Sequence, residues 1–241
     1  MKRMTVVVFD VDDTLYDQFV PFELAMTHSF QDKPWIKDMD LSTLYLLFRH
    51  HSDEMFPATV SGELSLEDMR VYRIQKALKD LGVEATDRKC QLFQDRYFYE
   101  QNRITVHPEM VDLLLILKER QILTGILTNG PTNHQQLKLD QLNVSTWIDS
   151  NTHHISESIG YSKPDAKAFQ VVANSYPEST EFLYIGDSYD NDVIGAKNAG
   201  WQVIWLNKYN KKLTQEMVKP DVEVTSYKEL AVNVLDLLQE E

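Results

Sequence analysis

Three aspartates lie within four positions near the start of the chain, in the stretch TVVVFDVDDTLYD. They are Asp10, Asp12 and Asp13, and they follow directly on four apolar residues of the kind found in buried strands. In extended backbone, residues two apart point the same way, so Asp10 and Asp12 can face one bound atom. Oxygen ligands of this kind suit Mg²⁺, which proteins usually hold with one or two carboxylates, water and substrate phosphate.

Polar residues and a glycine also stand at the ends of other predicted strands, or in the loop before a predicted helix: Thr128, Asn129, Gly130, Lys163, Asp187 and Ser188. Ligands of an open α/β sheet bind beyond the carboxyl ends of its strands, so we expect these side chains at one rim. Mg²⁺ and Lys163 would bring three positive charges against the carboxylates of Asp10, Asp12 and Asp187. With one aspartate protonated, the site would carry a charge of about +1 and could accept a phosphate dianion.

The elements that position these residues alternate along the chain. Short β-branched or aromatic runs predict strands at 5–9, 123–128, 181–186 and 201–206, with a weaker one at 221–225. Periodic segments with readable ends predict helices from Pro108 onward and at 133–142, 165–175, 190–199 and 227–238. Strands that alternate with helices predict a doubly wound parallel sheet of the α/β class.

The connection after the first strand is much longer than its neighbours. A whole βαβ unit takes about 30 residues, yet the first strand ends near Asp10 and the next core helix begins near Pro108. The surplus residues have helical patterns of their own. We therefore predict a helical insertion domain at 17–104 and a core domain formed by 1–16 and 105–241.

Composition argues against several classes of protein. The net charge of −13 opposes binding to a nucleic acid polymer, because such binding requires Lys and Arg to neutralise phosphates. The single cysteine, Cys90, excludes an intrachain disulfide. No stretch approaches the ~18 apolar residues of a membrane span, and the first apolar run is too short for a signal peptide. We expect a cytoplasmic monomer or homodimer that binds no membrane.

Four segments, FDVDDTLYD, ILTNG, SKPD and GDSYDND, resemble in that order the four motifs of the haloacid dehalogenase (HAD) superfamily of aspartyl phosphohydrolases. The first segment matches the family's DxDx[TV] signature at Asp10, Asp12 and Thr14. The resemblance covers the family's Rossmann-like core from both ends, and the helical insertion resembles its C1 cap. Within the family, ILTNGPTNHQQLKL is most similar to the branch of pyrimidine 5′-nucleotidases and sugar-phosphate phosphatases.

The resemblance implies a role for each residue of the first motif. Asp10 would be the nucleophile that attacks phosphorus and becomes an aspartyl phosphate. Asp12 would protonate the leaving alkoxide and then deprotonate the water that breaks the intermediate. Mg²⁺ would be the cofactor, bound by the carboxylates of Asp10 and Asp187 and by the backbone carbonyl of Asp12.

The remaining motifs would supply phosphate ligands and support. By resemblance, Thr128, Asn129 and Lys163 would hold the phosphate oxygens. Supporting positions would be Thr14, Gly130, Ser188 and Asp192. Asp190 and Asp192 compete for the second acidic role of the fourth motif. The spacing resembles the family's GDSxxND form and favours Asp192, which would support the metal's water shell or orient Lys163.

The resemblance leaves several activities open. The leading one is a Mg²⁺-dependent phosphatase of a small phosphorylated metabolite, with a nucleoside 5′-monophosphate ahead of a sugar phosphate. Phosphoglucomutase-like phosphoryl transfer shares all four motifs. Dehalogenases of the family lack a carboxylate at the position of Asp12 and need no Mg²⁺, so the presence of Asp12 argues against them. A non-enzymatic regulatory protein on this core typically lacks a motif residue, and here none is missing.

Two further predictions concern residues outside the motif roles. Asp13 is expected to face solvent or to favour the start of the following helix. His50, His51, His153 and His154 are expected to be solvated, because no Cys or His partner lies at zinc spacing.

Overall fold

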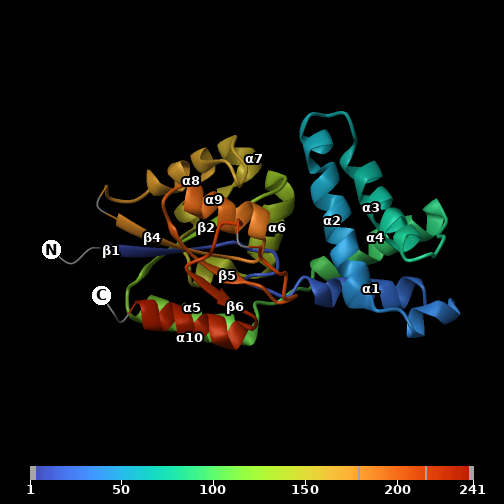
Figure 1. Cartoon of the computed structure of the whole chain (residues 1–241), viewed down its shortest axis with the longest axis horizontal. Coiled ribbons are helices and arrows are strands. Elements are labelled where there is room, and N and C mark those ends of the chain that lie inside the picture. Colours follow the sequence, from blue (N-terminus) through green and yellow to red (C-terminus); the bar gives the residue numbers. More distant parts are fainter. Residues whose placement is uncertain (1–3, 179, 215, 239–241) are drawn as a thin grey trace. The chain divides into compact units, whose positions relative to one another are not determined.

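The protein is described by a computed structural model, which covers residues 4–178, 180–214 and 216–238 (Figure 1). It divides into two compact units. The core unit comprises Met1–Asp17 and Ile104–Glu241, and the cap unit comprises Gln18–Arg103. The cap unit interrupts the chain between the first and second strands, which confirms the predicted helical insertion.

A six-stranded sheet forms the centre of the core unit. Its strands are β1 (Met4–Phe9), β2 (Leu123–Thr128), β3 (His153–Ile155), β4 (Thr180–Gly186), β5 (Gln202–Leu206) and β6 (Val222–Val224). They lie in the order β3-β2-β1-β4-β5-β6, and every neighbouring pair is parallel. Phe9 pairs with Ile126 of β2 and with Ile185 of β4, so the carboxyl ends of these three strands meet at one edge.

Helices cover both faces of the sheet (Figure 1). Helices α5 (Pro108–Glu119) and α10 (Tyr227–Leu237) pack on one face, and α8 (Ala166–Ala173) and α9 (Ile194–Asn198) on the other. Val7 and Phe9 of β1 belong to the first apolar layer, whereas Val6 and Val8 belong to the second. A central strand that is buried on both faces needs a continuous apolar run, as β1 has. The parallel sheet with helices on both faces confirms the doubly wound α/β prediction.

Helix ends follow from local sequence. Pro108 is the first residue of α5, where its missing N–H removes no helical hydrogen bond. Helix α6 (Thr132–Gln141) is followed by Asn143 in the left-handed region, at a φ of 52°. A π-helical turn (Tyr189–Val193) leads into α9, and α7 (Ser156–Ile159) follows β3.

The two chain segments that border the insertion are joined within the core unit. The backbone N–H of His107 donates to the carbonyl of Leu15 at 2.9 Å. Leu15 lies just before the chain leaves the core unit after Asp17, and His107 lies just after it returns at Ile104. The core is thus continuous across the insertion point.

The cap unit contains α1 (Phe19–Ser29), α2 (Leu41–Val60), α3 (Leu66–Asp80) and α4 (Asp87–Gln101). Ser65 and Thr86 cap α3 and α4, each accepting a backbone N–H three residues on. Aromatic rings fill the centre of this unit, with Phe22 at 5.1 Å from Phe48 and 5.5 Å from Phe93 between ring centroids. None of the described helices combines the length and apolar character that a membrane span requires.

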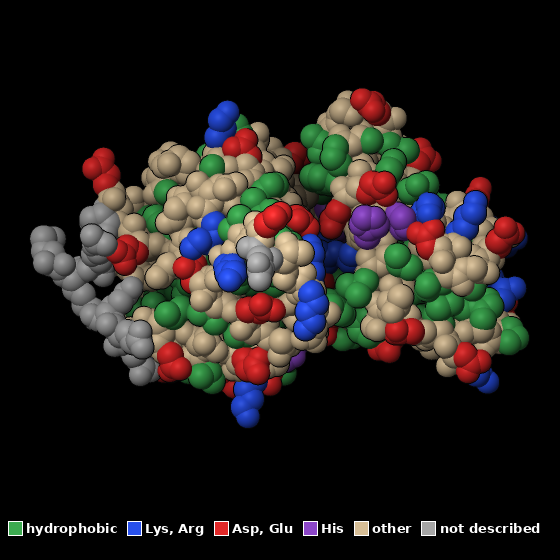
Figure 2. All heavy atoms as spheres, in the orientation of Figure 1, with side chains coloured by type: hydrophobic (Ala, Val, Ile, Leu, Met, Phe, Trp, Pro, Cys, Tyr) green, Lys and Arg blue, Asp and Glu red, His purple; other side chains and the backbone are tan. Residues whose placement is uncertain are grey.

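Acidic and basic side chains are interspersed on the face shown in Figure 2. This distribution accords with a chain whose formal net charge is −13 and offers no extended basic stripe on that face.

Candidate active site

Three carboxylates converge at the carboxyl edge of the central strands. Asp10 follows β1, Asp187 follows β4, and Asp192 lies in the π-helical turn after β4. One carboxylate oxygen from each of the three lies within 4.8 Å of the others. Asp10 is only 6% exposed and Asp192 is completely buried. Such a set of hard oxygen donors fits Mg²⁺, whose charge would offset their mutual repulsion.

A buried lysine faces this cluster. The Lys163 ammonium donates to Asp10 Oδ1 and to Asp192 Oδ1, each at 2.7 Å, and to the Tyr184 hydroxyl at 2.8 Å. Burial lowers the pKa of Lys163, but Asp10 and Asp192 outweigh it and raise that pKa above the usual value. Lys163 is therefore a fixed cation at the site.

Asp10 is poised between neutral and charged forms. Burial is the main cause that raises the pKa of Asp10 to about 6; Lys163 opposes the shift, and Asp192 and Asp12 add to it. A single lysine thus leaves the carboxylates incompletely neutralised, and a divalent cation would favour the ionised form of Asp10.

Asp192 is held by the backbone around it. Its Oδ2 accepts from the Ser188 N–H at 2.9 Å. Gly186 makes this approach possible, because a Cβ at that position would lie 2.3 Å from Asp192 Oδ2. The Asp190 side chain, by contrast, is 73% exposed and pairs with Lys211 at 3.0 Å. The structure therefore brings Asp192, and not Asp190, into the cluster.

The second motif positions the lysine. Asn129 Nδ2 donates to the Lys163 carbonyl at 2.9 Å, and Asn129 Oδ1 accepts from the Lys163 N–H at 2.9 Å. Both ends of this amide are therefore occupied by the Lys163 backbone. Thr128 is buried at the end of β2, beside the strand that delivers Asp10.

The supporting residues show distinct environments. Thr14 is buried, and its hydroxyl has no hydrogen-bond partner in the part of the chain that the structure describes. Gly130 has a φ of +144°, and its N–H donates to Ser156 Oγ at 2.9 Å. Ser188 caps the π-helical turn by accepting from the Asn191 N–H at 3.3 Å.

The Asp12 carboxylate is bound by a different set of groups. Lys138 Nζ donates to both of its oxygens at 2.7 Å, and Gln135 Nε2 donates to Oδ2 at 3.0 Å. The Tyr16 hydroxyl donates to Oδ1. Burial raises the pKa of Asp12, but Lys138 and these hydrogen bonds outweigh it and hold the pKa well below its usual range.

Sequence reasoning missed Lys138, Gln135 and Tyr184. A signal existed for the first two, because Gln135, Lys138, Leu139 and Leu142 share one face of α6 at helical spacing. A lysine is rarely buried unless it is paired, so a lysine on a face that also carries buried leucines predicts a carboxylate partner. Tyr184 lies between Leu183 and Ile185 in the buried strand β4, and its side chain points to the opposite face from theirs. Its hydroxyl donates to the Leu127 carbonyl at 2.8 Å.

The expectations for Asp13, His154 and His51 are wrong. Asp13 is buried rather than solvated, and it accepts from Lys208 Nζ at 2.7 Å, while Lys208 also reaches Asp17 at 3.1 Å. His154 is buried as well, with Nε2 at 3.1 Å from Ser175 Oγ. Local patterns show neither pairing, because both partners come from other elements.

His51 is the other buried exception among the histidines. In the cap unit it lies between Asp80, at 2.6 Å from Nε2, and Glu54, at 3.3 Å from Nδ1. It ties α2 to α3, and it forms a group of possible metal-binding side chains with His50 and Glu54.

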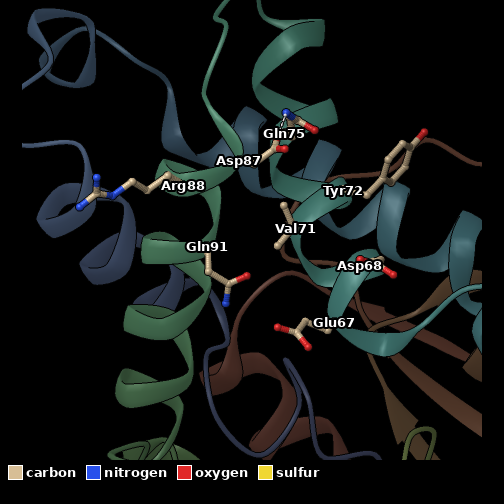
Figure 3. Close-up of a pocket in the computed structure, with 8 residues that line it drawn as sticks. All are labelled: Glu67, Asp68, Val71, Tyr72, Gln75, Asp87, Arg88 and Gln91. Carbon is tan, nitrogen blue, oxygen red and sulfur yellow. Dashed lines mark hydrogen bonds between the residues drawn. The ribbon is translucent and has the colours of Figure 1, made fainter.

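A pocket of about 420 Å³ opens on the cap unit between α3 and α4 (Figure 3). Its lining consists of Glu67, Asp68, Val71, Tyr72, Gln75, Asp87, Arg88 and Gln91. Gln75 Nε2 donates to Asp87 Oδ1 at 2.8 Å and links the two helices. No residue of the four motifs lines this pocket, so it is distinct from the carboxylate cluster.

Known proteins are similar in sequence to this chain over most of its length. HAD-hydrolase YfnB of Bacillus subtilis is 26% identical over 95% of each chain. Pyrimidine 5′-nucleotidase PynA of Streptococcus pneumoniae is 28% identical over 92% of each. Glyceraldehyde 3-phosphate phosphatase of Pyrococcus furiosus is 26% identical over 100% of this chain and 93% of its own.

Solved structures show the same fold. Magnesium-bound YfnB has a TM-score of 0.69 and covers 97% of this chain and 99% of its own. The L-2-haloacid dehalogenase RSc1362 has a TM-score of 0.71 at 20% identity, with 97% and 100% covered, and this likeness concerns the fold alone. The family of haloacid dehalogenase-like hydrolases matches residues 4–200. The chain therefore belongs to the haloacid dehalogenase-like hydrolases.

Proposed function

We propose that this hydrolase is a Mg²⁺-dependent phosphatase that acts on a small phosphorylated metabolite through an aspartyl phosphate on Asp10. The observation that carries the proposal is the meeting of Asp10, Asp187 and Asp192 around a common point, with the Lys163 ammonium 2.7 Å from Asp10. This is a site with carboxylates for a metal, one carboxylate for attack on phosphorus, and a cation for a phosphate oxygen.

The metal would be held by the carboxylates of Asp10 and Asp187 and by the backbone carbonyl of Asp12. When bound, Mg²⁺ would supply positive charge that attracts the phosphate dianion and lowers the cost of the charge that develops on it. Asp187 is itself positioned through its backbone, since Trp205 Nε1 donates to the Asp187 carbonyl at 2.8 Å.

In the first half of the reaction, an Asp10 carboxylate oxygen forms a bond to phosphorus as the bond to the leaving oxygen breaks. Asp12 gives a proton to that leaving oxygen, which requires its pKa to rise from the low value that Lys138 imposes in the free site, as the negative charge of a bound phosphate would cause. The Lys163 ammonium and the groups at Thr128 hold the phosphate oxygens while their charge increases.

In the second half, Asp12 takes a proton from a water molecule that attacks the phosphorus of the aspartyl phosphate. The bond between phosphorus and Asp10 breaks, so Asp10 is restored as a carboxylate and inorganic phosphate leaves. The same Asp12 carboxyl group therefore gives a proton in one half and takes one in the other.

The leading substrate in this proposal is a nucleoside 5′-monophosphate. The support is the stretch from Ile126 to Leu139, ILTNGPTNHQQLKL, together with the similarity to a protein named a pyrimidine 5′-nucleotidase. Sugar phosphates are the alternative, since another relative is named a glyceraldehyde 3-phosphate phosphatase. Asp12 argues against dehalogenation, because a halide leaves as an anion and needs no proton from a carboxyl group.

Hydrolysis of p-nitrophenyl phosphate tests the chemistry. We expect turnover with Mg²⁺, none in EDTA, and none in Asp10→Asn, with Asp190→Asn as a matched control of normal rate. A panel of nucleoside monophosphates, sugar phosphates and 2-haloacids then separates the substrate classes by kcat/KM. Phosphate release by Asp10→Asn at the normal rate would disprove the nucleophile, and halide release without phosphate release would disprove the phosphatase. Silence across the panel would favour a regulatory protein, and dependence on a sugar bisphosphate would indicate a mutase.

A further inference from the structure

Helix α6 buries two polar side chains on the face that it turns toward the first motif. Gln135 is 3% exposed and Lys138 is 5% exposed. They lie three residues apart, so they are neighbours on one side of the helix. A buried lysine costs free energy unless it is paired, and the partner of Lys138 is the Asp12 carboxylate.

The grip on Asp12 involves both of its oxygens. Oδ1 accepts from Lys138 and from the Tyr16 hydroxyl, and Oδ2 accepts from Lys138 and from Gln135. Donors at both oxygens fix the rotation of the carboxylate as well as its place. Tyr16 is itself fully buried, so this donor has little freedom to move.

The same helix couples Asp12 to the end of β2. Gln135 Nε2 also donates to the Asn129 carbonyl at 2.6 Å. Gly130 leaves space for this side chain, because a Cβ on Gly130 would lie 2.9 Å from Gln135 Nε2. The second motif and the Asp12 carboxylate are therefore held to one another through α6.

We infer that Lys138 is a positioning residue for proton transfer by Asp12, an inference that rests on the proposed phosphatase function. Proton transfer requires the donor and acceptor atoms to approach within about 2.6–3.2 Å, so the placing of this carboxyl group bears on the rate. Lys138 acts through Asp12, and Gln135 and Tyr16 share the task.

Aryl phosphates with different leaving groups test this role. The phenolate of phenyl phosphate needs a proton as it leaves, whereas 2,4-dinitrophenolate leaves as an anion, and kcat/KM covers the step in which it departs. Because general acid catalysis contributes about 10²–10⁴-fold, we expect Lys138→Met to lower kcat/KM about 100-fold for phenyl phosphate. For 2,4-dinitrophenyl phosphate we expect a loss below about threefold, since no proton is needed there. Lys138→Arg, which keeps the cation, should restore most of the phenyl phosphate activity.

A double variant shows whether Lys138 acts through Asp12. In Asp12→Asn, adding Lys138→Met should change kcat/KM by less than about threefold, because the group that Lys138 positions no longer transfers a proton. Lys228→Met, an exposed lysine on α10, is the matched control and should be as active as the wild type. Thermal unfolding of every variant checks the fold; if Lys138→Met does not fold, Tyr16→Phe should show the same leaving-group pattern with a smaller loss.

Equal losses for both esters, or losses that multiply in the double variant, would overturn the role of Lys138 while leaving the phosphatase proposal intact. A wild-type protein that cleaves neither ester with Mg²⁺ would instead defeat the phosphatase proposal, and this inference with it. The two failures are therefore distinguishable.

Discussion

Asn129 and Lys163 are joined by two hydrogen bonds of 2.9 Å, one in each direction between an amide side chain and a peptide backbone. They lie 34 residues apart in the sequence. The pair works like a clamp: the end of β2 fixes the loop that carries the lysine. The Lys163 ammonium can then bridge Asp10 and Asp192.

Replacing the amide should misplace the lysine. We expect Asn129→Leu to lower kcat about 10–100-fold, the usual range for a group that orients a ligand residue. The physical reason is that the backbone of Lys163 loses both of its side-chain partners. Steady-state kinetics measure the loss, with Asn174→Leu, at an exposed position, as the control. An unchanged kcat would show that the loop holds Lys163 without the clamp.

Asp10 should make the stability of the metal-free protein depend on pH. Its folded pKa of about 6 lies above the ordinary value of 3.8, so the native state binds this proton more tightly than the unfolded chain. The resulting stabilisation is complete below pH 3.8 and is lost as the pH rises through about 6. The side chain of Asp10→Asn cannot ionise. Its free energy of unfolding should therefore rise relative to that of the wild type by up to about 3 kcal/mol between acid and neutral pH.

Urea unfolding in EDTA at several pH values measures this difference. Asp190→Asn is the control, because that side chain is exposed and its difference from the wild type should not follow the same course. Addition of Mg²⁺ should stabilise the wild type more than Asp10→Asn. A constant difference between Asp10→Asn and the wild type from pH 4 to pH 8 would contradict the raised pKa.

Gly186 should be intolerant of even a methyl group. In Gly186→Ala the new Cβ would lie 2.3 Å from Asp192 Oδ2, so Asp192 must move and weaken its bond to Lys163. We expect a destabilisation of about 1–3 kcal/mol and a lower kcat. Gly160→Ala is the control, because it adds strain at a φ of 76° but meets no atom within 4 Å. Denaturant unfolding and kinetics on both variants check the contrast; equal activity in the two would refute it.

Lys208 should be important for stability although it lies outside the motifs. It pairs with the buried Asp13 at 2.7 Å and with Asp17 at 3.1 Å. Removing one partner of a buried ion pair costs about 3–5 kcal/mol, so Lys208→Met should lower the free energy of unfolding by about 3 kcal/mol. Lys208→Met combined with Asp13→Asn should be less destabilised than the sum of the two changes. Additive losses would show that the pair is not coupled.

Sequence predicted the sheet well where strands are buried on both faces. Apolar runs predicted four strands, β1, β2, β4 and β5. Helices cover both faces of the sheet, so a strand buried between the two layers must be apolar along its length. β3 was not predicted, because it is a three-residue edge strand that contains His153 and His154. An edge strand has one neighbour only, and its residues need no continuous apolar pattern.

The strand-end rule also located Asp10 and Asp187, because parallel strands bring their carboxyl ends together whatever lies between them in the sequence. Asp192 was expected only from the resemblance of the fourth motif, and the Asp12 carboxylate, which the rule grouped with the other two, pairs with Lys138 instead. The rule could not predict ion pairs between residues that lie far apart in the sequence. Lys138 meets Asp12 across 126 positions and Lys208 meets Asp13 across 195. Nothing near either lysine in the sequence marks its partner, so the burial of Asp13 and the grip on Asp12 needed the structure.

The hydrogen bond from His107 to Leu15 closes the core unit at the place where the cap unit is inserted. The core chain returns within one hydrogen bond of the place where it departs. Residues 18–103 therefore form an inserted segment whose two ends are joined to the core at neighbouring positions. We expect exchange of that segment for another helical one to leave the carboxyl ends of β1, β2 and β4 in place. A change within the helical unit would then alter the chain without altering its carboxylate cluster.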